Sequence, residues 1–222
     1  MPNKPWHLRY VRGLVYAALI ATIAGIAIAS TWDVKNATEA WVGARELYGL
    51  WGLALLIGAM VPGPLAFVIP WLPLKGHLML GRRALGVSAF VLATIHVATY
   101  LGPVLNRNWH ELFSPGKLWV AGLLLGIPLY LDMAILAFTS QDAAVRRLGP
   151  QQWKKWHRTV YLLLPLALVH ATFLGADFGF NKGPDVGGQP DAGSLIGMLA
   201  AAGAWLLLFY LRKRKIRWGT SG

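Results

Sequence analysis

The sequence predicts an all-α fold: a polytopic membrane protein built as a six-transmembrane-helix bundle with both termini cytoplasmic. Three observations indicate this class. Hydrophobic residues make up 56% of the 222 positions and charged residues 14%, whereas about a quarter of the residues in soluble domains are charged. The charged residues are clustered, which leaves long stretches that carry none. Lys and Arg are concentrated in alternate connections between those stretches. We therefore expect one integral membrane domain over residues 1–222.

The apolar stretches have the length of membrane-spanning helices. A bilayer core of about 30 Å is crossed by roughly 20 apolar residues in a helix. The stretches are too long and too uniformly apolar for the strands of a membrane barrel. They are Gly13 to Thr31, Leu47 to about Pro64, Ala84 to Leu101, Leu118 to Ser140, Thr159 to Ala176 and Ala192 to Leu211, and Asp132 interrupts the fourth. Aromatic residues near their ends, such as Trp119 and Trp156, fit an interfacial belt.

The first stretch also allows a second interpretation. It follows a basic segment, and Ala27-Ile28-Ala29 resembles a cleavage site, so the stretch could be a signal peptide. Its removal would leave the orientation of the remaining helices unchanged.

The positive charges predict the orientation. Basic residues occur in the N-terminal segment, the second and fourth connections and the C-terminal tail. With six crossings all four segments share one side, which is the cytoplasm because cytoplasmic loops are enriched in Lys and Arg. The net charge of +12 is thus explained by topology. We therefore expect the chain to contact the lipid bilayer and to bind no nucleic acid. The residues are Lys4, Arg9, Arg12, Lys75, Arg82, Arg83, Arg146, Arg147, Lys154, Lys155, Arg158, Arg212, Lys213, Arg214, Lys215 and Arg217.

The chain contains no cysteine. This excludes a disulfide scaffold, an iron–sulfur cluster and a thiolate zinc site. Redox or metal chemistry must therefore use His, carboxylate or Met.

Two histidines inside the predicted helices are the strongest functional candidates, because ionisable residues within a membrane are costly. At about 1.5 Å per residue, His96 lies roughly 20 Å above Arg83 and His170 roughly 18 Å above Arg158. Two imidazoles at one depth near the outer leaflet suit the axial ligation of a heme iron. The absence of C-x-x-C-H makes that heme b-type. The alternative is that each histidine hydrogen-bonds a neighbouring helix.

Two further ionisable groups lie nearer the inner surface. His157 precedes His170 by thirteen residues, with Pro165 between them. It could ligate a second, inner heme, contact a different cofactor or lie in the headgroups. An inner heme lacks an obvious partner ligand, because the matching position on the third helix is Arg83, which leaves His77 or another residue. Asp132 could accept a proton from a quinol or hold a ligand histidine, but we expect it to pair with Arg82, Arg83 or Arg158.

Several segments resemble a known family. They are Gly49-Leu50-Trp51, the segment from Gly81 to Gly86, Ala93-Thr94-Ile95-His96 and the stretch from Leu136 to His170. Over residues 49–174 the chain resembles the ferric-reductase-like transmembrane superfamily and, within it, the MsrQ/YedZ type. That type is the heme-binding membrane subunit of the bacterial periplasmic methionine sulfoxide reductase system.

The resemblance implies a function. It implies heme b in the bacterial inner membrane, with His96, His157 and His170 matching the family's histidines, and FMN as a further cofactor. We also expect Arg82, Arg83 and Arg147 to bind cofactor, although the positive-inside rule explains them too. The implied acceptor is a periplasmic molybdopterin-containing methionine sulfoxide reductase. No G-x-G-x-x-G follows a strand, so the donor should be a membrane quinol or a cytoplasmic flavin reductase.

Two other functions remain open at this point. The chain could be a stand-alone ferric reductase or quinol-oxidising cytochrome with an outer acceptor site at Asp177, Asp185 and Asp191. It could also be a cofactor-free transporter or assembly protein whose histidines relay protons.

Overall fold

The computed structural model describes residues 6–32, 34–106, 108–113, 116–174, 199–200, 202–207, 209–211 and 213. Over these residues the chain is helical and contains no strand. The α-helices are α1 (Trp6–Ala29), α2 (Ala37–Met60), α3 (Pro62–Val68), α4 (Lys75–Thr99), α5 (Lys117–Phe138), α6 (Asp142–Trp156) and α7 (Val160–Leu174). A π-helical turn η1 (Tyr100–Val104) and two 3-10 turns, η2 (Trp109–Leu112) and η3 (His157–Thr159), complete the described part.

Five helical segments are long and apolar enough to cross a membrane: Tyr10–Ala29, Ala37–Val68, Lys75–Val104, Lys117–Phe138 and Asp142–Leu174. They contain the first five predicted spans apart from a residue or two at some ends, so the polytopic all-α class is confirmed. Of the sixth predicted span, residues 192–198, 201 and 208 lie outside the described residues. Most of the described part belongs to a shorter apolar helix, Ala202–Leu211. The predicted outer loop, with Asp177, Asp185 and Asp191, also lies outside the described residues.

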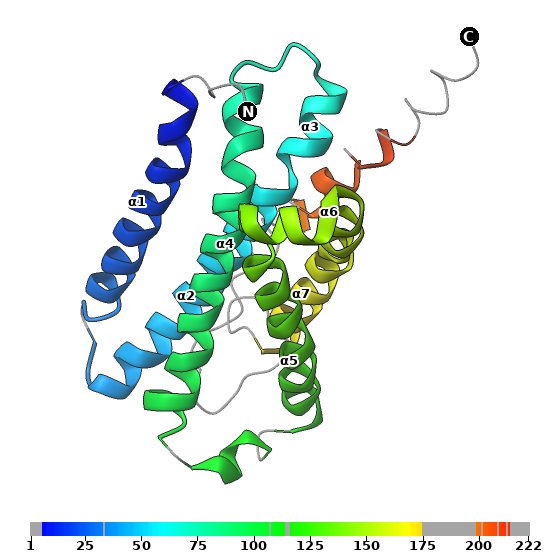
Figure 1. Ribbon diagram of the computed structural model, residues 1–222. Coiled ribbons are helices and arrows are strands. Elements are labelled where there is room, and N and C mark those ends of the chain that lie inside the picture. The colour runs from blue at the N-terminus through cyan, green and yellow to red at the C-terminus, as the bar shows by residue number, and fades with distance from the viewer. Residues whose placement is uncertain are drawn as a thin grey trace.

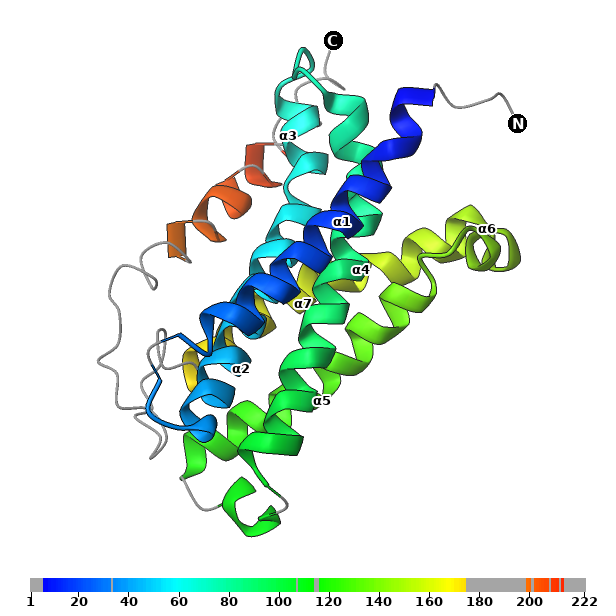
Figure 2. The ribbon, with the colours of Figure 1, turned by 90° about the vertical axis from the view of Figure 1, so that its left-hand side faces the viewer.

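The helices pack mainly as two pairs. α2 lies along α4 and α5 lies along α7, while α4 also contacts α5 and α1 covers α4 and α2 (Figures 1 and 2). α6 runs across the bundle rather than along it (Figure 1). We call the end that holds α3, α6 and the first turns of α1 and α4 the basic end. The opposite end, which holds η1 and η2, is the far end.

Two apolar clusters hold the bundle together. One joins α2, α4, α5 and α7 to the helical residue Trp205, and the other attaches α1 to α2 and α4. The apolar side chains left outside, such as Leu124, Ile127 and Leu131 on α5, are exposed, as expected for a surface that faces lipid. The buried members are Leu56, Met60, Ala89, Leu129, Leu163, Leu164 and Trp205 in the first cluster, and Leu19, Ile26, Ala44, Tyr48 and Leu92 in the second.

Small residues bring α2 and α4 close together. A Cβ added to Gly52 would lie 3.6 Å from the carbonyl oxygen of Ala89 and from the backbone nitrogen of Ala93. Ala84, Ser88 and Ala89 on α4 are fully buried. Membrane helices associate through such close packing. Lipid is as apolar as a helix–helix interface, so burying apolar side chains between helices gives no hydrophobic driving force.

The start of α2 is fixed by its own side chains. Asn36 Oδ1 accepts a hydrogen bond from the Glu39 backbone nitrogen at 2.9 Å, and Glu39 Oε2 accepts one from the Lys35 backbone nitrogen at 2.9 Å. Such reciprocal capping satisfies donors that a helix start leaves unpaired. The first turns of α2, which contribute to the site described below, are therefore held in register.

We expect Gly52→Leu to destabilise the protein, because the larger side chain would force α2 away from α4. Overpacking of this kind costs about 1–3 kcal/mol, so the midpoint of thermal unfolding in detergent should fall by several degrees. Gly43→Leu is the matched control on the same helix, since nothing lies within 4 Å of a Cβ at Gly43. Equal midpoints for the two variants would show that the α2–α4 contact does not limit stability.

Candidate functional site

The far half of the bundle contains two histidines with the same local geometry. His96 Nδ1 on α4 lies 2.7 Å from the carbonyl oxygen of Arg45 on α2. His170 Nδ1 on α7 lies 2.9 Å from the carbonyl oxygen of Gly122 on α5. A carbonyl oxygen only accepts hydrogen bonds, so each Nδ1 must carry the proton and donate it. In the neutral ring this leaves Nε2 with a free lone pair, which is the form of imidazole that ligates metals.

A glycine four residues after each carbonyl makes room for the ring. A Cβ added to Gly49 on α2 would lie 2.9 Å from His96 Nδ1, and one added to Gly126 on α5 would lie 2.8 Å from His170 Cε1. Real Cβ atoms do not approach other atoms so closely. Each imidazole therefore lies against a helix surface that only glycine leaves open, and the same arrangement of carbonyl, helical turn and glycine occurs twice.

The two histidines lie at similar depths in the bundle. Arg45 is eight residues into α2 and Gly122 five residues into α5, so the hydrogen-bonded carbonyls lie about 12 Å and 8 Å from the far-end starts of their helices. The two alternatives considered for these histidines are thus compatible, because Nδ1 bonds a neighbouring helix while Nε2 stays available.

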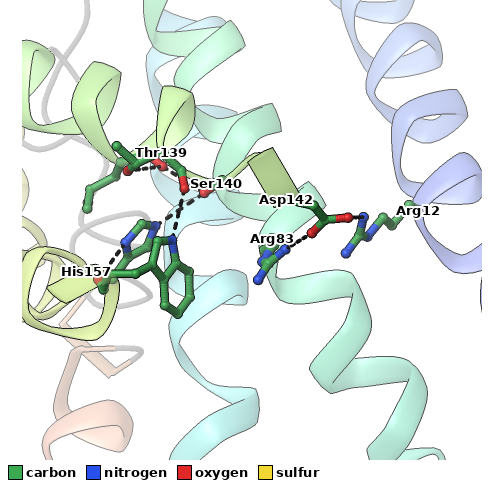
Figure 3. Close-up of polar contacts among 8 residues, drawn as sticks. Arg12, Arg83, Thr139, Ser140, Asp142 and His157 are labelled. Atoms are coloured by element: carbon green, nitrogen blue, oxygen red, sulfur yellow. Dashed lines mark hydrogen bonds and ion pairs between the residues drawn. The ribbon is translucent and has the colours of Figure 1, made fainter. Parts of the chain in front are cut away.

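His157 belongs to a separate cluster at the basic end. It lies in the 3-10 turn η3 that joins α6 to α7, and its ring stacks on Trp153 with a centroid distance of 4.0 Å. Its Nδ1 is 3.2 Å from the Trp153 carbonyl oxygen and its Nε2 is 3.4 Å from Ser140 Oγ (Figure 3). Trp153 Nε1 in turn donates to the Thr139 carbonyl at 2.9 Å. His157 is therefore held at the junction of α5, α6 and α7.

Arg83 connects this cluster to α1 and α4. Its guanidinium lies 5.2 Å from the Trp153 ring centroid, and its Nη1 is 2.6 Å from Asp142 Oδ1. The other oxygen of Asp142 is 4.0 Å from Arg12 Nη1 (Figure 3). Of the other arginines predicted to bind a cofactor, Arg82 donates to the Ala59 carbonyl on α2 at 2.8 Å, and Arg147 is exposed on α6.

The predicted ion pair of Asp132 is wrong. Its Oδ1 accepts a hydrogen bond from Thr159 Oγ1 at 2.9 Å, and none of the ion pairs among the described residues includes it. The reason is tertiary: η3 places a neutral hydroxyl beside the carboxylate, while Arg83 turns toward Asp142. His77, considered as a ligand opposite His157, lies six residues before Arg83 on α4, about 9 Å further along the helix.

A pocket of about 470 Å³ opens beside the basic-end cluster, between α1, α4 and the end of α5. Tyr16, Phe90 and Phe138 form part of its apolar wall, while Arg12, Arg83, Gln141 and Asp142 make it polar. Ser140 also lines the pocket and is the residue whose hydroxyl contacts His157 Nε2. The pocket thus combines an apolar wall with a polar end, and Ser140 connects that polar end to His157.

Sequence reasoning did not assign a role to Gly49, Gly126 or Trp153. Their partners are remote in the chain: the hydrogen bonds of His96 and His170 span 51 and 48 residues. The one signal present is the pair of glycines inside apolar helices, since Gly in a helix interior is unfavourable unless close packing requires it.

Known proteins show similarity to most of this chain. The model of the family described as ferric reductase like transmembrane component matches residues 48–168. The protein-methionine-sulfoxide reductase heme-binding subunit MsrQ of Caulobacter vibrioides is 32% identical over 160 residues, which cover 72% of this chain and 73% of that protein. The protein of the same name from Azospira oryzae is 34% identical over 128 residues, which cover 57% of this chain and 52% of that protein.

Proposed function

The chain belongs to the ferric-reductase-like transmembrane family, in its MsrQ group, and from this premise we propose that it is the heme-binding electron-transfer subunit of a membrane methionine sulfoxide reductase system. The observation that supports the proposal best is the pair His96 and His170. Each histidine is hydrogen-bonded through Nδ1 to a carbonyl on the adjacent helix. The two Nε2 atoms are therefore suited to ligate one heme iron.

His96 and His170 would hold the iron through Nε2. The geometry fits this role in two ways. The Nδ1 hydrogen bonds to the carbonyls of Arg45 and Gly122 orient the rings and raise the basicity of Nε2. The glycine surfaces at Gly49 and Gly126 keep the rings in place. When bound, a heme carries one electron at a time by cycling its iron between the ferric and ferrous states.

We propose one b-type heme, because the described residues hold one such histidine pair and the sequence has no C-x-x-C-H for covalent attachment. Within the described residues no group of three or more His, Cys, Asp or Glu side chains could hold a bare metal ion. FMN stays a prediction from the resemblance, with the exposed Arg147 as the expected phosphate contact.

The pocket beside His157 favours a quinol as the electron donor. A quinol has a polar ring and an isoprenoid tail, which match the polar end and the apolar wall of the pocket. Oxidation to the quinone releases two electrons, in two successive one-electron steps, and two protons. Ser140 could pass one proton to His157 Nε2, 3.4 Å away, and the other would leave to solvent past the exposed carboxylate of Asp142. A cytoplasmic flavin reductase would instead dock on the exposed surface of α6.

Electrons would then cross from the basic end to the far end. By the positive-inside rule the basic end faces the cytoplasm, so the histidine pair lies near the periplasmic surface of a bacterial inner membrane. There a soluble molybdopterin-containing methionine sulfoxide reductase could collect the electrons. The chain itself has no substrate or nicotinamide site in this scheme.

We expect His96→Ala and His170→Ala to remove the heme signal from the reduced-minus-oxidised optical spectrum of the purified protein. Gly49→Ala and Gly126→Ala should weaken heme binding about 10- to 100-fold, the usual cost of disturbing a residue that orients a ligand. Gly86→Ala is the control, because a Cβ there meets nothing within 4 Å. Full heme content in both histidine variants, with the fold verified by circular dichroism, would refute the assignment.

We expect His157→Ala to separate heme binding from electron donation. The variant should keep the heme spectrum and its reduction by dithionite but lose most of its reduction by a quinol, because the group that takes the proton is gone. Lys155→Ala, an exposed neighbour on α6, should behave like the wild type. Loss of the whole heme signal in His157→Ala, with retention in His170→Ala, would mean that the ligand pair is misassigned.

We expect the basic end to be cytoplasmic. In intact cells, an impermeant thiol reagent should label a cysteine introduced at Gly187 and leave one at Gln151 unlabelled until the membrane is opened. The opposite pattern would reverse the topology and the direction of electron flow.

A further inference from the structure

Arg45 is a buried cation with an unused hydrogen-bond donor. The residue is 5% exposed, and its Nη1 has no hydrogen-bond partner among the described residues. Its Nη2 lies 3.0 Å from Oε1 of the adjacent Glu46, whose side chain is 25% exposed. Its guanidinium also faces the Tyr100 ring at 5.7 Å. One partly solvated carboxylate therefore leaves half of the guanidinium fork unsatisfied.

A second unused donor lies in the same region. Trp119 on α5 is 6% exposed and its Nε1 has no partner among the residues that the structure describes. Its ring is 6.1 Å from the ring of Tyr100. Tyr100 thus contacts both residues, so Arg45, Tyr100 and Trp119 form one cluster at the far end.

Both donors are next to the histidine pair. The backbone carbonyl of Arg45 is the acceptor for His96 Nδ1, and Trp119 precedes by one helical turn Gly122, the acceptor for His170 Nδ1. Each of the two helices that orient a histidine therefore also contributes one buried, unused donor. Buried polar groups are nearly always hydrogen-bonded, and an unpaired buried charge is more costly still. Two such donors, one of them cationic, are suited to an anionic acceptor.

We propose that Arg45 Nη1 and Trp119 Nε1 bind the propionate carboxylates of the heme. Propionates are the anionic groups that a heme held by His96 and His170 would bring to this region. Arg pairs strongly with carboxylates because its N–H groups form charge-assisted hydrogen bonds. The proposal rests on the proposed function, since it requires a heme at this histidine pair.

The test compares two hemes in the same protein. Apoprotein in detergent is titrated with protoheme and with its dimethyl ester, in which both propionates have lost their charge. We expect the wild type to bind the ester about tenfold or more weakly, the factor that corresponds to one lost charge-assisted hydrogen bond. Arg45→Met should bind the two hemes with nearly equal affinity, and Arg45→Lys, which keeps the charge, should discriminate partly.

A second readout is the midpoint potential of the bound heme. Loss of a nearby positive charge disfavours the extra electron of the ferrous state, so Arg45→Met should have a lower potential. The potential should also become dependent on pH near neutrality, because an unpaired propionate takes up a proton on reduction. Lys35→Gln, which removes an exposed charge just before α2, should change neither property.

Trp119→Phe tests the second donor, since it keeps the ring and removes the N–H group. It should reduce the discrimination between the two hemes, whereas Trp205→Phe should not. Trp205 also has a buried, unpaired Nε1 but belongs to the apolar cluster with Leu163 and Leu164.

Two results would contradict the proposal directly. Equal affinity of the wild type for protoheme and its ester would overturn it, as would the same ratio in the wild type and Arg45→Met. Those results differ from a failure of the proposed function, in which the wild type would bind neither heme. The comparison of the two hemes in the wild type stands even if Arg45→Met does not fold.

Discussion

The hydrogen bond from a histidine Nδ1 to a backbone carbonyl on the neighbouring helix is the interaction on which the site depends. It requires the imidazole to lie flat against that helix, which only a glycine one turn later permits. Because the bond uses the backbone, it sets the rotation and depth of one helix against its partner. The same bond that holds His96 between α4 and α2 holds His170 between α7 and α5. Each bond thereby aligns one helix pair, α2 with α4 and α5 with α7.

The arginines at the two ends of the bundle differ in exposure and in pairing. At the basic end Asp142 lies between Arg12 and Arg83, and all three side chains are partly or largely exposed, so solvent and a countercharge screen the arginines. At the far end Arg45 is buried with half of its fork unpaired. Ion pairs in water are worth little, whereas an unpaired buried charge is expensive. The far end is therefore the place where an anionic group would gain most from binding.

The predictions from sequence succeeded where one residue type or one pattern carries the signal. Apolar runs predicted six spanning helices, and five are present among the described residues, because a bilayer demands length and apolarity from each helix separately. The equal depth of His96 and His170 is a prediction from the constant rise of an α-helix, and their carbonyl partners lie on the first turns of α2 and α5. The ion pair of Asp132 failed because it needed the rotation of three helices, which composition does not encode. The 3-10 turn at His157 and the contact of Thr159 with Asp132 were equally invisible.

The sequence by itself determined that this chain is a helical membrane protein with histidines in its apolar stretches. A bilayer requires each span to be apolar along its whole length, and that requirement is visible in the sequence. Only the tertiary structure decided which atoms those histidines contact. Their Nδ1 partners are carbonyls about fifty positions away, and every residue has a carbonyl, so no side chain marks the partner. Likewise, the sequence indicates only that Arg45 is a charged residue at the edge of a loop. It became a buried, unpaired donor beside His96 because α2 begins at Ala37 and packs against α4. The packing of the helices determines which side chains and carbonyls are in contact, and those contacts determine which chemistry is possible.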